Sequence, residues 1–245
     1  MTYDISVTWD GHELHDLFVI EEIVRPAMGS SKLTTATVGF ADGVRFVGTR
    51  REAPQVSLKL FAQGSDAREV RAAWERLAEW LHVDEPKRLV FGDEESYYRL
   101  AIPTGNVDVS HAAHNSERAS VSFLVPDGRL WSPAEQVAGA SGTSSATVRN
   151  LGSAPAKPTI TVPAATGNLV FRLGDDGPTM SLSVGSEPKS VVIDCASRSC
   201  SIDGTPALIR LDEDFFELPP RAASKITRAS GSGDFTVSLR PSRWC

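Results

Sequence analysis

Short segments that alternate apolar and polar residues dominate this chain, and only one segment has the periodicity of a helix. The first alternating segment runs from Tyr3 to Trp9, and the turn-forming pair Asp10-Gly11 ends it. In the second half, turn signals recur about every ten residues, which is the spacing typical of a sandwich or jelly roll. We therefore predict a mainly β protein.

The remaining strands are predicted from the same alternation. In the first half they are Leu33–Phe40, Val44–Thr49, Gln55–Phe61, Arg88–Phe91, Tyr97–Pro103 and Ser120–Val125. In the second half they are Ala146–Asn150, Lys157–Val162, Leu169–Leu173, Met180–Val184, Ser190–Asp194, Ser199–Asp203, Leu208–Arg210, Phe215–Leu218, Lys225–Ala229 and Phe235–Arg240.

One helix is predicted from Asp66 to His82. Its apolar residues fall on one helical face, at Val70, Trp74, Leu77 and Leu81. Asp66 and Glu69 have the spacing of a capping box, and Ser65 is an alternative N-cap. We expect Trp74 and Trp80 to pack in or beside the core rather than to hold a ligand.

The segment 133–146 is rich in small and polar residues and has no apolar periodicity, so it is predicted to be a linker or loose loop. This places two domains at residues 1–139 and 140–245. The first is expected to be a β-sandwich or barrel-like domain with one α-helix, and the second a β-sandwich.

Charge and hydropathy exclude several classes of protein. Residues 1–139 hold 14 Lys/Arg and 21 Asp/Glu, a net charge of −7, and neither half has a basic stripe. We therefore expect no binding of nucleic acid by its phosphates. No apolar run is long enough to span a membrane, and the N-terminus lacks a secretory pattern, so assembly is expected in the cytosol.

Motifs that carry chemistry are missing from the sequence. The glycine-rich segment Gly139–Gly142 lacks the lysine of a phosphate loop, and no Gly-x-Ser-x-Gly elbow is present. Pairs of histidines, His12/His15 and His111/His114, lie three residues apart on loop- or strand-like segments, where such spacing points side chains to opposite faces. We predict no enzyme, no metal and no cofactor.

Cys195 and Cys200 flank a four-residue loop between two short predicted strands. If they face each other at the neck of this hairpin, their separation permits a disulfide. The alternative is two reduced thiols, as expected of a protein assembled in the cytosol.

An ordered series of motifs in residues 1–130 resembles the N-terminal domain of siphophage distal tail proteins. It comprises Asp10-Gly11, the strand Phe18–Pro26 that ends in Arg-Pro, the Asp42-Gly43 hairpin, Gly48-Thr49-Arg50, the strand from Val56, the helix end Leu77–Leu81, Lys87–Asp93 with Tyr97-Tyr98, and Val121–Asp127.

The second half is similar to the C-terminal galectin-like jelly-roll sandwich of the same family. The resemblance rests on Val148–Ile160, the Val192-Ile193-Asp194 hairpin, Phe215–Leu218 with Pro219-Pro220, and the final Trp244. The family commonly has glycine at the turn after Leu-Pro, and Pro220-Arg221-Ala222 departs from that pattern.

This resemblance implies a structural protein of the virion that forms a homohexameric ring at the tail tip. The implied partners are the tail-tube protein, the tail-tip hub with tape-measure-associated proteins, and receptor-binding proteins mounted on the second domain. The two strands around Asp42-Gly43 are expected to offer an edge to the next subunit. The candidate interface residues are Leu33, Val38, Phe40, Val44, Phe46 and Arg50.

Two alternatives remain open from the sequence. A carbohydrate-binding module of the tail tip would need an exposed aromatic platform, and residues 140–243 contain neither Trp nor Tyr. A tail-tube subunit would share the style of the first domain but would not need the second.

Overall fold

The computed structural model describes residues 5–39 and 42–245. The chain divides into two compact units, Met1–Trp131 with Trp244–Cys245 (the first unit) and Ser132–Arg243 (the second unit). Within the described residues there is one α-helix and the rest of the regular structure is almost entirely β, as predicted. The expected boundary after residue 139 falls inside the second unit.

The first unit is built around one ten-stranded sheet, with a strand order of β2-β1-β7-β8-β10-β6-β3. Strand β9 also pairs with β10, and β11 with β8. The strands are β1 (Val7–Trp9), β2 (His12–Glu13), β3 (Val19–Val24), β6 (Gln55–Gln63), β7 (Lys87–Phe91), β8 (Tyr98–Thr104), β9 (Ser110–Ala113), β10 (Ser116–Leu124) and β11 (Arg129–Trp131). Two short 3-10 turns are η1 (Leu14–Asp16) and η2 (Gly92–Glu94).

The core of the first unit follows from period-two burial on its long strands. In β6, Val56, Leu58, Leu60 and Ala62 are buried while the residues between them are not. The indole ring of Trp9 on β1 packs against Phe123 on β10, with ring centroids 4.7 Å apart. The alternating strands therefore contribute their apolar side chains to one shared core.

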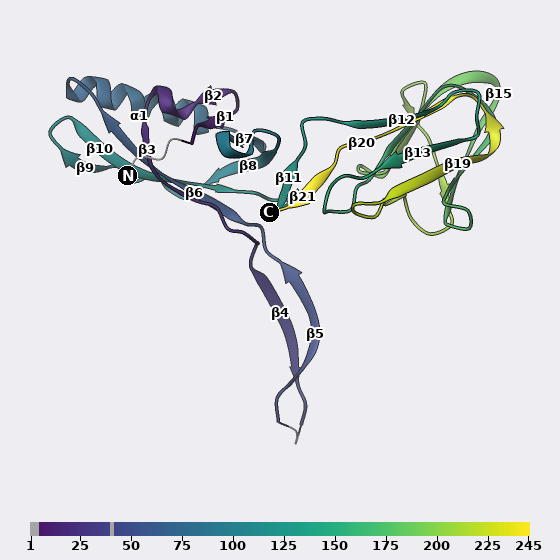
Figure 1. The fold of residues 1–245 in the computed structure, drawn as a ribbon, viewed down its shortest axis with the longest axis horizontal. Helices are drawn as coiled ribbons and strands as arrows, with labels where there is room; N and C mark the ends of the chain where they lie inside the picture. Colours follow the sequence, from purple (N-terminus) through teal and green to yellow (C-terminus); the bar gives the residue numbers. More distant parts are fainter. Residues whose placement is uncertain (1–4, 40–41) are drawn as a thin grey trace. The chain divides into compact units, whose positions relative to one another are not determined.

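Helix α1 (Ala67–Leu81) covers this sheet beside β6 and β10 (Figure 1). Its N-cap is Asp66, whose side chain accepts hydrogen bonds from the backbone N–H groups of Arg68 and Glu69, as predicted. Val70 and Leu77 are buried, and Trp74 packs on Phe18 at 4.7 Å. The Trp80 carbonyl accepts a hydrogen bond from the Trp9 indole. The aromatic residues of the helix thus serve packing.

The second unit contains a nine-stranded sheet whose main path is β12-β20-β14-β15-β16-β17, with β13 and β18 joined through β19 and β15. Its strands are β12 (Gln136–Ala140), β13 (Ser145–Arg149), β14 (Thr159–Leu173), β15 (Thr179–Asp194), β16 (Ser199–Ile202), β17 (Thr205–Pro206), β18 (Arg210–Leu211), β19 (Ala223–Ser232) and β20 (Phe235–Leu239). The tenth strand of the other sheet is β21 (Ser242–Trp244), which pairs with β11.

Three expectations for this half are wrong. Segment 133–146 is not a loose loop, because β12 pairs with β20 and β13 with β19. The four strands predicted between 157 and 194 are two long strands, β14 and β15, bent by register shifts near Gly167. Residues 215–218 form no strand; Leu218 makes only an isolated bridge to Ala156, although Phe216 and Leu218 are buried.

No helix in the described part of the chain combines the length and the apolar character needed to cross a membrane.

Candidate assembly interface

A hairpin of two strands, β4 (Ser31–Thr37) and β5 (Val44–Arg51), forms a sheet of its own. We call residues 31–51 the arm. It continues from the β3–β6 strand pair and extends away from α1 and the other strands of the first unit (Figure 1). Among the described residues, β4 and β5 pair only with each other, so the outer edge of each strand is free.

A β-bulge decides which side chains share a face of the arm. Leu33 pairs with Thr49 and Thr34 with Gly48, but Thr35 then pairs with Phe46, so Val47 is an extra residue in β5. Simple alternation along β5 would put Phe46 and Arg50 on the same face. The extra residue places them on opposite faces.

One face of the arm is apolar. Leu33 lies on the same face as Phe46 and Val44, with threonines between them. Leu33 and Val44 are each 63% exposed and Phe46 is 61% exposed. Val38, which follows β4, is also exposed, whereas Phe40 lies outside the described residues. A folded protein seldom leaves such a group uncovered unless another surface packs on it.

The opposite face of the arm is basic. The pairing places Lys32 beside Arg50, and Arg45 follows on the same face beside Ala36. All three are exposed. Arg50, a predicted interface residue, therefore belongs to a different face from Leu33 and Phe46. The sequence alone does not place Lys32 and Arg45 on one face with Arg50, because the alternation of residues does not show the bulge.

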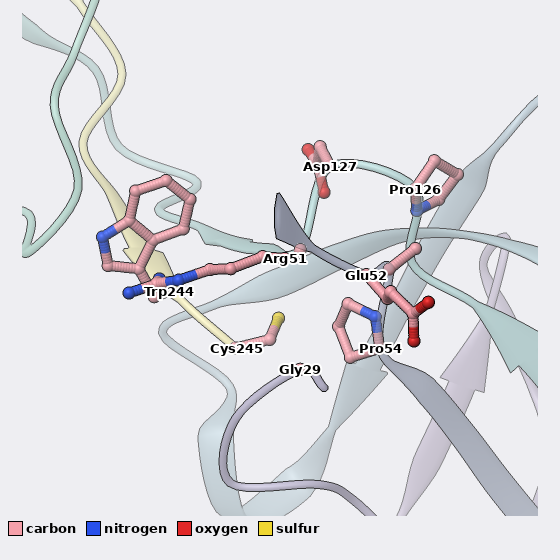
Figure 2. Close-up of a pocket in the computed structure, with 10 residues that line it drawn as sticks. Gly29, Arg51, Glu52, Pro54, Pro126, Asp127, Trp244 and Cys245 are labelled. Carbon is pink, nitrogen blue, oxygen red and sulfur yellow. The ribbon is translucent and has the colours of Figure 1, made fainter. Parts of the chain in front are cut away.

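The root of the arm is held by residues from distant parts of the chain (Figure 2). The guanidinium groups of Arg51 and Arg129 lie over the Trp244 ring, 5.0 Å and 5.1 Å from its centroid. The backbone N–H of Cys245 donates to the Gly128 carbonyl at 2.9 Å. Trp244 and Cys245 thus hold the end of β5 in place where the arm joins the rest of the first unit.

Close backbone packing completes the root. The Glu52 N–H donates to the Ser30 carbonyl at 2.8 Å, and the Ser30 hydroxyl donates to the Glu52 carboxylate at 2.5 Å. A Cβ added at Gly29 would lie 2.7 Å from the Glu52 carbonyl oxygen, so only glycine fits there. The cavity among these residues is about 70 Å³, which is too small for a sugar or nucleotide.

Arg25, in the Arg-Pro pair that precedes the arm, is fixed by two carboxylates. Its guanidinium lies 2.5 Å from Asp93 and 3.2 Å from Glu94. The hydrogen bond from Arg25 holds the pKa of the Asp93 carboxyl below its usual range. The chain therefore enters the arm from a well-anchored position.

Of the two possibilities for Cys195 and Cys200, the structure has the two reduced thiols. Cys200 pairs with Ile193, and Asp194 pairs with Ser199, so Cys195 lies beyond the end of the ladder. Both thiols are free and buried in the core of the second unit. Burial raises the pKa of Cys195 to about 12 and that of Cys200 to about 11, which disfavours the thiolate form of both side chains.

No catalytic arrangement is visible in the described ranges 5–39 and 42–245. These residues contain no group of three His, Cys, Asp or Glu side chains placed to hold a metal ion. His12 stacks on Trp80 at 4.4 Å, and His111 lies 3.1 Å from Glu117. An open groove of about 500 Å³ along α1 has His82 as its one titratable lining residue, without a partner acid or base.

The second unit offers no aromatic platform for a sugar. Its sequence lacks Trp and Tyr, and Phe171, Phe216 and Phe235 are buried in its core. Phe215 is only partly buried, but it too packs against that core.

The comparison with known proteins agrees with the resemblance stated from the sequence. Residues 10–125, which include the arm, match the family described as phage tail protein RIFT-related domain. The distal tail protein of Bacillus phage SPP1 is 27% identical over 240 residues, covering 89% of this chain and 91% of the relative.

Solved structures show the same fold. The crystal structure of the SPP1 Dit protein, described as a paradigm of the hub adsorption apparatus in phages infecting Gram-positive bacteria, matches with a TM-score of 0.84. It has 18% identity and covers 98% of this chain and 99% of that chain. A chain of the phage P2 baseplate in its activated conformation with Ca matches with a TM-score of 0.50 and 8% identity, over 97% of each chain.

Proposed function

Since this chain is similar to a siphophage distal tail protein along most of its length, we propose that it forms the ring that joins the tail tube to the tail-tip hub. Its role in the virion tail is structural rather than catalytic. Six subunits, the tail-tube protein, the hub with its tape-measure-associated proteins and the receptor-binding proteins follow from the family resemblance.

The observation that carries this proposal is the arm. Its apolar face exposes Leu33, Val44 and Phe46 within the matched phage tail domain. Covering each of these side chains is worth roughly 1.5–3 kcal/mol, before the entropy of association is subtracted. A two-stranded hairpin is only marginally stable alone, so an adjacent copy that covers it or pairs with its edge would also stabilise it.

A closed ring also requires a heterologous contact, in which two different surfaces of each subunit meet. The arm supplies one of these surfaces. In this proposal the second unit, a galectin-like sandwich, serves as a mount for receptor-binding components. Its lack of exposed aromatic rings argues against the alternative role in carbohydrate binding.

The test is the mass and shape of the purified chain. Analytical ultracentrifugation and negative-stain microscopy should show closed rings of about six times 26.4 kDa. The double variant Leu33→Ser/Phe46→Ser should sediment as a single chain, because it removes most of the apolar face. Val137→Ser/Leu208→Ser, two exposed apolar residues of the second unit, is the matched control and should retain the ring.

The alternatives predict different results. Open-ended polymers would identify a tail-tube subunit, and a chain that stays monomeric at high concentration would contradict ring formation. Specific signals on a glycan array, absent from a control sandwich protein, would support the carbohydrate-binding role.

A further inference from the structure

Within the first unit, the arm and the remaining residues carry net charges of opposite sign. Residues 31–51 hold four Lys/Arg and one Asp, a net charge of +3. The other residues of 1–131 hold ten Lys/Arg and 19 Asp/Glu, a net charge of −9. A basic hairpin therefore extends from an acidic unit.

The basic residues of the arm face are not used within the chain. No ion pair within 4.0 Å joins Lys32, Arg45 or Arg50 to a carboxylate in the part of the chain that the structure describes. Other arginines of the same unit are paired, such as Arg25 with Asp93 and Arg118 with Glu21. Arg51, at the root, packs on Trp244 and does not belong to this face.

We infer that the basic face of the arm docks on the acidic surface of a second copy of this chain. This inference rests on the proposed ring and names the second half of its contact. Both faces of the arm would then be covered in the ring. The apolar face would be buried by packing against an adjacent copy, and Lys32, Arg45 and Arg50 would lie against carboxylates of an adjacent copy. Charge complementarity of this kind sets register and partner choice more than raw affinity.

A second copy fits better than nucleic acid as the partner. The arm's three free cations lie on a short hairpin of a unit whose remaining charge is strongly negative, and duplex DNA would be repelled by that remainder. An identical copy supplies the opposite charge wherever the first copy supplies the arm.

The experiment compares ring formation by three versions of the 245-residue chain. In Lys32→Glu/Arg45→Glu/Arg50→Glu the arm face becomes acidic, and rings should be lost at concentrations where the unchanged protein forms them. The control Arg149→Glu/Lys157→Glu/Arg210→Glu makes the same change at exposed sites of the second unit and should retain rings. Circular dichroism checks that both variants fold.

Salt dependence supplies a second readout. Raising NaCl from about 0.05 M to about 0.5 M should weaken assembly of the unchanged protein and of the control by about tenfold, because the contact is screened. Lys32→Gln/Arg45→Gln/Arg50→Gln should assemble more weakly at low salt and lose most of this salt dependence.

The outcomes separate this inference from the proposed function. If the charge-reversed protein forms rings as readily as the unchanged one, the basic face is only a solvated surface and the inference is wrong, while the ring stands. If the unchanged protein forms no ring, the proposed function itself fails. A gel-shift assay with duplex DNA tests the other partner. If the unchanged protein retards the DNA, the charge-reversed protein does not, and both form rings, nucleic acid is the partner of the basic face and the inference is overturned.

Discussion

Asn150 is a fully buried polar residue of the second unit, and its side chain organises the loops around it. Its amide group donates to the carbonyls of Ala154 at 2.9 Å and Pro219 at 3.2 Å, and its oxygen accepts from the Gly152 N–H at 2.9 Å. The alternation in the sequence predicts a strand that ends at Asn150, but no local pattern shows which distant carbonyls an asparagine will satisfy.

Asn150→Ala should lower the free energy of unfolding of the second unit by about 1–3 kcal/mol, since buried backbone groups lose their partners. Chemical denaturation monitored on that unit measures the change. Asn168→Ala, at an exposed position of β14, should change stability little. Equal effects of the two substitutions would contradict the role given to Asn150.

The buried thiols make a second prediction at the residue scale. Ellman's reagent at neutral to mildly alkaline pH should not label Cys195 or Cys200 until the second unit unfolds, because burial raises both pKa values. Rapid labelling of both thiols in the native protein would contradict the observed packing.

The same thiols predict a loss of stability at high pH. The unfolded Cys195 thiol ionises near pH 9.0, whereas the folded thiol stays protonated until about 12. The stabilising contribution is therefore complete below pH 9 and is lost as pH rises towards 12. Cys195→Ala should flatten this decline for the second unit, and Cys245→Ala, in the first unit, should not.

At the scale of elements, the root of the arm depends on the last residues of the chain. Trp244 is 41% exposed, yet its ring contacts the guanidinium groups of both Arg51 and Arg129. A hairpin that pairs with nothing else among the described residues needs such a fixed root if its faces are to meet a neighbour in one orientation.

Trp244→Ala should loosen the root by about 1 kcal/mol, the usual value of an exposed cation–π contact. Hydrogen exchange of the amides at 51–53 should then be roughly fivefold faster, while amides of α1 keep their rates. Leu208→Ala, at a residue 97% exposed in the second unit, is the control and should leave exchange at 51–53 unchanged.

At the scale of the whole molecule, each unit buries its own core, and each has its own natural probe. All five tryptophans lie in the first unit, whereas Cys195 and Cys200 lie in the second. Tryptophan fluorescence and thiol labelling therefore report on different units of the same chain.

Phe123→Ala should shift the fluorescence-detected transition, and Phe171→Ala the thiol-detected one. Each removes a fully buried ring and should cost about 3–5 kcal/mol in its own unit. A variant that shifts both transitions equally would show that the two cores unfold as one.

Much of this fold is determined by local pattern in the sequence. The alternation in β6 and β10 predicts strands because side chains of a strand point to opposite faces, and the spacing from Val70 to Leu81 predicts α1 because residues three and four apart share a helical face. The spacing of Asp66 and Glu69 predicts the start of α1, and in the structure the Asp66 carboxylate accepts from the first free N–H groups. The motifs of 1–130 also sufficed to predict the resemblance to distal tail proteins.

Tertiary structure decided what depends on pairing between distant segments. Segment 136–140 is a strand only because β20 lies beside it, and the thiols of Cys195 and Cys200 do not face each other because the β15–β16 register sets them apart. Trp244 reaches the arm root through contacts that no local spacing encodes. The extra residue Val47 gives the arm one apolar and one basic face, and this bulge exists only in the pairing of β4 with β5.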